Sequence, residues 1–255
     1  MKIILVGIGG ALGRAIYSIA KEQNVEIVAG VDALADSLDF PVPLYKNILD
    51  CKEKADAIID FSRPTSLASI LEYATKTNTP AVLATTGYTK EQQDSVDETS
   101  KKVAIFQSSN MSLGVNLLIN LAKQATEFLG ADYEIEIIEK HHNRKVDAPS
   151  GTALSIAKAV NESRDNSLNY VYGRNLESGK RERSDIGIHA VRGGNIVGEH
   201  DVMFIGSEEI ITLSHSAQSR SVFALGAIRA SKFIAGKSPA KYDMNDLISS
   251  MFANK

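Results

Sequence analysis

The first half of the chain alternates short apolar runs with longer amphipathic segments. The apolar runs are near-continuous, which is typical of strands that are buried on both faces of a parallel sheet. They lie at residues 3–6, 27–31, 57–61, 81–84 and 103–106. The amphipathic segments between them predict helices at residues 11–22, 64–75 and 91–101. Strands and helices in alternation indicate a doubly wound α/β layer.

The second half follows a different pattern. Residues 111–129 predict one long helix, and residues 133–139 alternate acidic and apolar positions, as in a strand with one exposed face. Further strands, separated by glycine-containing turns, are predicted at residues 186–191, 196–205 and 209–215. We therefore predict a mixed or antiparallel sheet with open faces, flanked by helices, and a domain boundary near residue 112.

Two other segments of the second half complete the predicted organisation. Residues 161–183 are polar and irregular, which predicts a surface excursion without regular structure. Residues 222–235 predict a last apolar helix, with Gly236 placed where a C-cap glycine stands. The chain shows no internal repeat and no low-complexity tract.

Composition excludes several classes of function. The chain is 44% hydrophobic and 23% charged, and its net charge of −3 gives no reason to expect nucleic acid or an anionic membrane as a partner. No apolar run approaches the roughly 20 residues that span a bilayer, and the N-terminal MKIILVGIGG lacks a signal-peptide cleavage pattern. The single cysteine, Cys51, cannot form an intrachain disulfide and has no neighbouring histidine. We therefore expect a cytoplasmic protein with an inert cysteine.

The segment GIGGALGR, residues 7–14, lies between the first predicted strand and the first helix. Its spacing, Gly7, Gly10 and Gly13, is G-x-x-G-x-x-G and not the strict G-x-G-x-x-G. Such a loop lets a pyrophosphate approach the backbone and a helix N-terminus, although a tight turn without ligand is the alternative. Asp32 ends the second strand about 20 residues further on, where an acid can hydrogen-bond the adenosine ribose, and it favours dinucleotide binding.

Two neighbouring positions bear on the choice of dinucleotide. Ala33 follows Asp32, and Ala11 occupies the loop, so that neither supplies a cation for a 2′-phosphate; Arg14 stands one turn into the helix. These positions favour NADH over NADPH. Two loops after later strands are further candidates, because open α/β sheets bind ligands at these strand ends, although turn formation alone would also explain them. They are Ala84, Thr85, Thr86 and Gly87, and Ser108, Ser109, Asn110 and Met111.

The segment HHNRKVDAPSGTA, residues 141–153, concentrates candidate catalytic groups. It contains two of the five histidines, His141 and His142, together with Lys145 and the start of a predicted helix. A histidine can donate a proton near neutral pH, and the lysine adds a positive charge. The first helical turn predicts a seat for a carboxylate made of unpaired N–H groups. These belong to Ser150, Gly151 and Thr152.

Simpler interpretations of this segment remain open. Ser150 or Thr152 can act as an N-cap alone, the histidines can be surface imidazoles, and Arg144 and Lys145 can be solvated charges. A metal site is disfavoured, because neighbours on a strand point to opposite faces and no cysteine or clustered histidine completes a ligand set. The clustering favours an anion-binding catalytic site without metal. Beside a nicotinamide cofactor, such a site indicates reduction of a carboxylate-bearing substrate.

Several segments resemble the dihydrodipicolinate reductase family. They are GIGGALGR, ATTGYT at 84–89, SNMSLGVN at 109–116, EIIEKHHNRKVDAPSGTAL at 136–154, VRGGNIVGEH at 191–200 and SHSAQSRSVFALGAIRA at 214–230. The resemblance spans essentially the whole chain, and the HH-x-x-K-x-DAPSGTA block is its most specific part. It implies a Rossmann-type dinucleotide-binding domain of residues 1–112 and 221–255. It also implies an α+β domain of residues 113–220, with an open mixed sheet, that binds substrate and builds a homotetramer.

The resemblance further implies an activity in diaminopimelate and L-lysine biosynthesis. This activity is hydride transfer from NADH or NADPH to C4 of 4-hydroxy-tetrahydrodipicolinate, giving tetrahydrodipicolinate. By resemblance, His141 is the acid/base residue, and Lys145 is a proton donor and substrate ligand. Further substrate contacts fall on His142, Ser150, Gly151 and Thr152. The cofactor contacts fall on Gly7, Ile8, Gly9, Gly10, Ala11, Leu12, Asp32, Ala84, Thr85, Thr86, Ser108, Ser109, Asn110 and Met111.

The chain departs from the family at two positions. Many members carry an arginine where this chain has Ala11, and some carry one where it has Ala33. Both departures support NADH. Two rival functions remain: an NAD-dependent reductase or dehydrogenase of another small amino or imino acid, and a redox-sensing dinucleotide-binding protein without catalysis. The second requires no His-Lys site, so the intact HHNRKVDAPSGT block argues against it.

Overall fold

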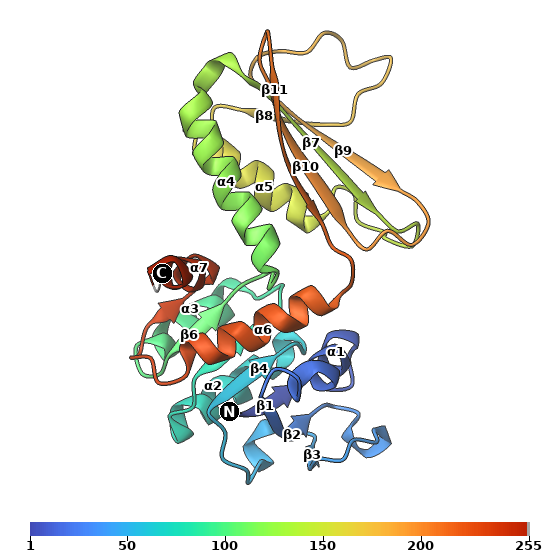
Figure 1. Cartoon of the computed structure of the whole chain (residues 1–255). Helices are drawn as coiled ribbons and strands as arrows, with labels where there is room; N and C mark the ends of the chain where they lie inside the picture. Colours follow the sequence, from blue (N-terminus) through green and yellow to red (C-terminus); the bar gives the residue numbers. More distant parts are fainter. Residues whose placement is uncertain (254–255) are drawn as a thin grey trace. The chain divides into compact units, whose positions relative to one another are not determined.

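The computed structural model describes residues 1–253 and divides into two compact units. The first contains Met1–Leu113 together with the chain from Arg220 onward, and the second is Gly114–Ser219 (Figure 1). Among residues 1–253, no helix is long and apolar enough to cross a membrane. The roles predicted for the two units, dinucleotide binding for one and substrate binding with oligomerisation for the other, stay predictions.

The first unit is built on a parallel sheet of seven strands in the order β12-β6-β5-β4-β1-β2-β3. The strands are β1 (Lys2–Val6), β2 (Glu26–Val31), β3 (Leu44–Tyr45), β4 (Ala57–Asp60), β5 (Ala81–Leu83), β6 (Ile105–Gln107) and β12 (Lys241–Tyr242). The doubly wound prediction is therefore confirmed. Strands β3 and β12 were not predicted, because two residues are too few to show a hydrophobic period. The parallel order places the carboxyl ends of all strands at one edge of the sheet.

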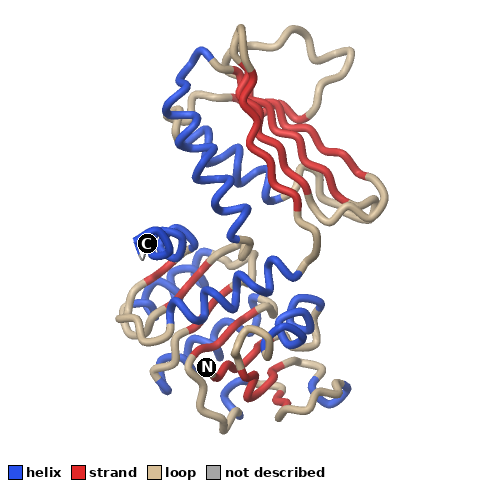
Figure 2. Tube along the Cα trace, in the orientation of Figure 1, coloured by secondary structure: helices blue, strands red, loops and turns tan. Residues whose placement is uncertain are grey.

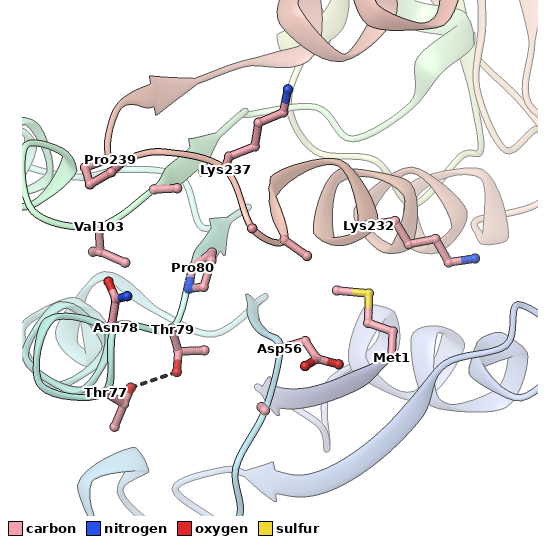
Figure 3. Close-up of a pocket in the computed structure, with 14 residues that line it drawn as sticks. Met1, Asp56, Thr77, Asn78, Thr79, Pro80, Val103, Lys232, Lys237 and Pro239 are labelled. Atoms are coloured by element: carbon pink, nitrogen blue, oxygen red, sulfur yellow. Dashed lines mark hydrogen bonds between the residues drawn. The ribbon is translucent and has the colours of Figure 1, made fainter. Parts of the chain in front are cut away.

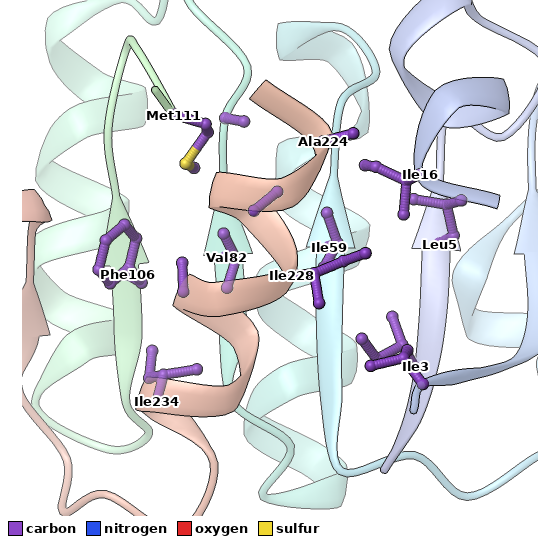
Figure 4. Close-up of a cluster of buried hydrophobic side chains, with 14 of the residues drawn as sticks. Ile3, Leu5, Ile16, Ile59, Val82, Phe106, Met111, Ala224, Ile228 and Ile234 are labelled. Atoms are coloured by element: carbon purple, nitrogen blue, oxygen red, sulfur yellow. The ribbon is translucent and has the colours of Figure 1, made fainter. Parts of the chain in front are cut away.

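Helices cover both faces of this sheet. They are α1 (Ala11–Ala20), α2 (Leu67–Thr77), α3 (Lys90–Ser100), α6 (Ser221–Ile234) and α7 (Met244–Ala253). Helices α1 and α6 pack on one face, where Ile228 and Ile234 of α6 meet Ile59, Val82 and Phe106 of the strands (Figure 4). A helix from the end of the chain thus completes a core begun by the first strands, which explains why this unit is discontinuous in sequence.

The second unit contains a mixed sheet of five strands in the order β11-β10-β7-β9-β8. Its strands are β7 (Glu134–His141), β8 (Asn169–Tyr172), β9 (Asp185–Arg192), β10 (Glu199–Ile205) and β11 (Ile210–Ser216). Strand β7 runs parallel to β9 and antiparallel to β10, which confirms the predicted mixed sheet. Helices α4 (Leu113–Leu129) and α5 (Gly151–Glu162) lie against one face (Figure 2).

Two details of this unit differ from the prediction. The segment predicted to be irregular, residues 161–183, contains strand β8, which pairs in parallel with β9. Most β8 side chains are exposed, so the strand has no apolar alternation and forms through backbone hydrogen bonds to its neighbour. The strand predicted from residue 196 begins at Glu199, and Gly236 follows α6 with a φ of +75°, as the predicted C-cap requires.

Candidate active site

The glycine loop joins β1 to α1 at the carboxyl edge of the parallel sheet. Gly7 has a φ of +82°, and a Cβ on it would lie 2.6 Å from the carbonyl oxygen of Phe61. A Cβ on Gly13 would lie 2.1 Å from the carbonyl oxygen of Gly7, so that the helix can approach the loop only at glycine. Gly10 is the N-cap of α1 and no side chain caps this helix, which leaves its positive end open to an anion.

A pocket of about 480 Å³ lies beside this loop and brings several predicted cofactor residues together. Gly7, Gly9, Gly10 and Asp32 all line it. Each carboxylate oxygen of Asp32 accepts one backbone N–H, from Gly9 at 3.0 Å and from Leu34 at 3.0 Å. The carboxylate is thereby held at the mouth of the loop, where it can accept hydrogen bonds from ribose hydroxyls. Three features of the pocket fit a dinucleotide: the glycine loop, the uncapped N-terminus of α1 and the fixed carboxylate of Asp32.

The pocket also contains residues that the sequence prediction missed. They include Lys46 after β3 and a segment after β4 that contributes Ser62, Arg63, Thr65 and Ser66. The position of this segment directly after a buried strand could have indicated it, because parallel strands end at the same edge. Lys46 forms an ion pair with Asp36 on the surface. The wall of the pocket therefore carries two cations, although positions 11 and 33 are alanines.

The remaining predicted cofactor residues lie elsewhere around this edge. The side chains of Ile8 and Met111 are buried in the core, so only their backbones can meet a ligand. Residues 84–86 follow β5 and residues 108–111 follow β6, and none of them lines the pocket. Ala11 is exposed and Leu12 is half-buried at the start of α1. The structure thus places all of these residues at one edge of the sheet, but gathers only some around the pocket.

A second pocket, of about 690 Å³, lies at the opposite edge of the same sheet (Figure 3). It is lined where strands begin, at Asp56 before β4 and Pro80 before β5, and by Lys232 of α6. Two of its polar groups are already bonded to the protein: the Lys232 ammonium donates to the carbonyl of Gln23 at 2.6 Å, and Asp56 accepts the N–H of Lys2 at 2.7 Å. None of the predicted site residues lines this pocket.

In the second unit, the two ends of the histidine segment, at His141 and Ser150, contact the buried side chains of Glu139 and His200. Strand β7 ends at His141, and its register places Glu139 opposite His200 of β10 and His141 opposite Arg192 of β9. Residues two apart on a strand share a face, so both groups of β7 point to the same side. The side chain of Glu139 is 0% exposed, and it accepts hydrogen bonds from Arg192 at 2.6 and 2.7 Å.

Glu139 also contacts both His141 and Ser150, at the two ends of the histidine segment. One of its oxygens lies 2.6 Å from Nδ1 of His141, and the other accepts the backbone N–H of Ser150 at 2.9 Å. Burial alone would raise the pKa of this carboxyl, but the hydrogen bonds from Arg192 and His141 outweigh it and hold the pKa below its usual value. Neither Glu139 nor Arg192 was predicted from the sequence, because each stands inside an ordinary strand pattern.

Ser150 is the N-cap of α5, which was one of the interpretations left open. Its hydroxyl accepts the N–H of Ala153 at 3.2 Å and lies 3.0 Å from Nε2 of His200. The prediction of an unpaired N–H at Ser150 does not hold, because this N–H donates to Glu139. Gly151 is exposed, and nothing lies within 4 Å of where its Cβ would be. The open part of this helix N-terminus is therefore at Gly151, directly after the cap.

The cations of the segment are held by neighbouring groups. Lys145 lies 2.8 Å from the carboxylate of Asp147 and is 21% exposed, and this contact lowers the pKa of Asp147. Arg144 is exposed and donates to the side-chain oxygen of Asn195 at 3.0 Å. His142 is partly buried. Among residues 1–253, no cluster of three or more acidic, histidine or cysteine side chains is arranged to hold a metal ion.

His200 stands between charged and titratable groups on the same sheet. Its side chain packs against the ring of His141, with ring centroids 5.3 Å apart, and it faces Glu139 of β7 and His215 of β11. Burial, and then the neighbouring His141, lower the pKa of His200 to about 4 from an ordinary value of 6.5. His200 is therefore neutral at pH 7, and its role is to hold Ser150 rather than to carry charge.

The depressed pKa of His200 predicts acid sensitivity of the fold. Between pH 6.5 and 4, His200 is protonated in the unfolded chain but stays neutral in the folded chain. The free energy of unfolding therefore decreases as pH falls through this window. The expected loss is on the order of 3 kcal/mol. His200→Gln should remove this part of the pH dependence, as measured by urea unfolding at intervals from pH 7 to 4.

The other charged or ionisable groups around His200, namely Glu139, His141, Lys145 and His215, are present in both proteins, so the difference between the two curves isolates His200. His189→Gln, on the opposite face of the sheet, is the matched control. Equal pH dependence in the wild type and in the His200 variant would contradict the assignment.

The fold and the two sites together define a class of protein. One unit has the glycine loop, open helix end and fixed acid of a dinucleotide-binding domain, and the other holds histidine, lysine and an open helix N-terminus within one segment. A two-domain oxidoreductase that uses a nicotinamide dinucleotide on an anionic substrate combines these features.

Comparison with known proteins specifies the family. The family model for the N-terminus of dihydrodipicolinate reductase matches residues 1–111, and the model for its C-terminus matches residues 114–248. The chain belongs to the dihydrodipicolinate reductase family. It is 49% identical over 249 residues to 4-hydroxy-tetrahydrodipicolinate reductase of Caldanaerobacter subterraneus subsp. tengcongensis, covering 97% of this chain and 98% of that one.

Two further relatives support the same assignment. The 4-hydroxy-tetrahydrodipicolinate reductase of Clostridium tetani is 49% identical over 252 residues, with 98% of each chain covered. A solved structure, dipicolinate-bound dihydrodipicolinate reductase from Paenisporosarcina sp. TG-14, superposes with a TM-score of 0.81 at 25% identity. The superposition covers 96% of this chain and 98% of that one. The resemblance noted from the sequence is thus confirmed.

Proposed function

We propose that this chain catalyses the NAD(P)H-dependent reduction of 4-hydroxy-tetrahydrodipicolinate to tetrahydrodipicolinate, a step of diaminopimelate and L-lysine biosynthesis. The observation that carries the proposal is the 49% identity to reductases of this name over nearly the full length of both chains. A small dicarboxylate as substrate agrees with the dipicolinate bound to the solved relative. The overall reaction consumes NAD(P)H and one proton and releases NAD(P)⁺ and water.

The residues of the first unit would hold the cofactor. The loop Gly7–Leu12 offers its backbone and the N-terminus of α1 to the pyrophosphate, and Asp32 accepts hydrogen bonds from the ribose. The loops at residues 84–86 and 108–111 serve the remainder of the dinucleotide. When bound, the nicotinamide supplies the hydride that reduces C4 of the substrate ring.

The residues of the second unit bind the substrate and supply the proton. Gly151 and Thr152 present the N-terminus of α5 to a carboxylate, while Ser150 holds this turn in place. Lys145 adds a positive charge and exchanges its exposed partner Asp147 for the substrate. His142 completes the substrate contacts.

His141 is the proton donor. Its Nδ1 faces Glu139, so that Nε2 is the nitrogen left to exchange a proton with the substrate.

The pocket also bears on the choice of cofactor. Asp32 beside Ala33 favours the free ribose hydroxyls of NADH, because a carboxylate repels a 2′-phosphate. Lys46 and Arg63 in the wall of the pocket supply positive charge that makes NADPH usable. We therefore propose use of both cofactors, with NADH preferred.

Assembly and location follow from the same proposal. The sheet of residues 113–220 has helices on one face only among the described residues, and its other face is proposed to join copies of the chain into a homotetramer. The enzyme is proposed to act in the cytoplasm, where metabolism regenerates NAD(P)H. Sedimentation of the purified protein tests the tetramer directly.

The proposed activity predicts oxidation of NADH and NADPH by the freshly generated substrate. The substrate is made in the assay from pyruvate and aspartate semialdehyde by the enzyme of the preceding step, and absorbance of the reduced cofactor is followed. We expect turnover with both cofactors and a higher kcat/KM with NADH. Turnover of another imino acid alone would favour the rival reductase. NADH binding without any turnover would favour a non-catalytic sensor.

A further inference from the structure

Glu139 is the most heavily bonded buried acid of the second unit, and no role in the reaction has been assigned to it so far. It lies on β7, two residues before His141, and its side chain is 0% exposed. A buried carboxylate is costly unless hydrogen bonds and a cation compensate its charge. The arrangement of its partners shows what it does.

Arg192 compensates the charge of Glu139. The two terminal nitrogens of its guanidinium donate to the two carboxylate oxygens at 2.6 and 2.7 Å, which is the bidentate geometry of a strong ion pair. The same nitrogens also donate to the backbone carbonyls of Asp147, at 2.7 Å, and Val191, at 2.8 Å. The pair is thus anchored to the backbone on both sides of the site, and the carboxylate stays ionised at neutral pH.

The ionised carboxylate fixes the protonation pattern of His141. A carboxylate only accepts hydrogen bonds, so Nδ1, which lies 2.6 Å away, must carry a hydrogen. Proton exchange is then confined to Nε2. A Cβ on Gly198 would lie 3.0 Å from this nitrogen, and glycine at that position keeps a side chain from crowding it.

The carboxylate of Glu139 also holds the N-terminus of α5, which is proposed to bind the substrate carboxylate. Its second oxygen accepts the N–H of Ser150 at 2.9 Å, and Ser150 caps the helix whose first turn opens at Gly151. His200 supports Ser150 from the other side, at 3.0 Å. Glu139 therefore positions both the His141 ring, which donates the proton, and the first turn of α5, which binds the substrate carboxylate.

We propose that Glu139, anchored by Arg192, is a positioning residue that holds His141 in its proton-donating state and in register with the helix N-terminus of the substrate site. This inference rests on the proposed function in assigning His141 as the proton donor. Its structural content, the coupling between Glu139 and His141, is independent of which substrate the enzyme reduces. The consequence is a loss of turnover, more than of substrate affinity, when the charge of Glu139 is removed.

The variant that tests the proposal is Glu139→Gln. We expect kcat to fall about 10- to 100-fold with a much smaller change in KM, because proton transfer is impaired. The pH profile of kcat should also change, because a charge that contacts the proton donor has been removed. Nitrogen NMR of labelled His141 should show the hydrogen no longer confined to Nδ1.

The chain offers a matched control three residues earlier. Glu136 points to the other face of β7, where it lies 2.7 Å from Nε2 of His189 and accepts from Arg181 at 2.9 Å. Glu136→Gln therefore breaks a similar acid, histidine and arginine set away from the site. We expect this control to leave the pH profile of kcat and the His141 spectrum unchanged.

A second variant covers the case in which Glu139→Gln fails to fold because Arg192 is left unpaired. The double variant Glu139→Gln/Arg192→Gln removes both charges, and the same shifts in pH profile and spectrum are expected from it. An unchanged pH profile and unchanged His141 spectrum in a folded variant would overturn the proposal. Failure of the wild type to reduce the substrate would instead overturn the proposed function, since the NMR measurement needs no substrate.

Discussion

Replacing His141 by alanine is expected to lower kcat by about 10²- to 10⁴-fold with little change in the KM of the substrate. The imidazole supplies a proton only as the reaction proceeds, whereas the carboxylate seat and Lys145 bind the ground state. The ring is 12% exposed and is held at Nδ1 by Glu139, so that Nε2 is left to exchange the proton. The measurement is steady-state reduction with saturating NADH.

His189→Ala is the control for this experiment. His189 also lies beside a glutamate, Glu136, but on the opposite face of the sheet, and its loss should leave kcat within about twofold of the wild-type value. An increase in KM alone for the His141 variant would show that His141 is not the proton donor. Circular dichroism of both variants establishes that they are folded.

Gly226→Ala is expected to destabilise the first unit by about 3 kcal/mol or more. Gly226 lies inside α6, where alanine would ordinarily be better than glycine by about 1 kcal/mol. A Cβ at this position, however, would lie 1.6 Å from the carbonyl oxygen of Met111 and 2.8 Å from its carbonyl carbon. Because both atoms belong to the backbone at the end of the first half of the chain, the helix would have to move away from its core, and the clash outweighs the propensity.

Urea unfolding monitored by circular dichroism measures this effect. Gly193→Ala is the control, since no heavy atom lies within 4 Å of its Cβ position and its φ is not left-handed. Its effect should stay within about 1 kcal/mol. Equal stabilities of the two variants would show that α6 is not seated against Met111 as described.

The hydrophobic periods of this chain determined most of the first unit. Five buried strands and the helices between them follow from apolar runs that need only local information, and the glycine loop with Asp32 follows from spacing. Strands β3, β8 and β12 could not be found in this way. Each is short or largely exposed, and each exists because a neighbouring strand offers backbone hydrogen bonds.

The candidate site shows the same division. The HHNRKVDAPSGT block indicated His141, Lys145 and a helix start, because imidazole, ammonium and a capping serine have recognisable chemistry in any context. It did not indicate that Ser150 would have its N–H occupied. That outcome depends on the register of β7 and on Glu139, whose alternation looks like that of an ordinary half-exposed strand.

The sequence by itself therefore determined the fold class and the family and predicted the reactive groups, because these depend on patterns along the chain. The tertiary structure alone decided how these groups are held. The Glu139–Arg192 pair joins residues 53 positions apart, and the contact of Ser150 with His200 spans 50. Such contacts follow from the pairing of β7 with β9 and β10, and strand pairing is set by the packing of whole faces rather than by any local pattern.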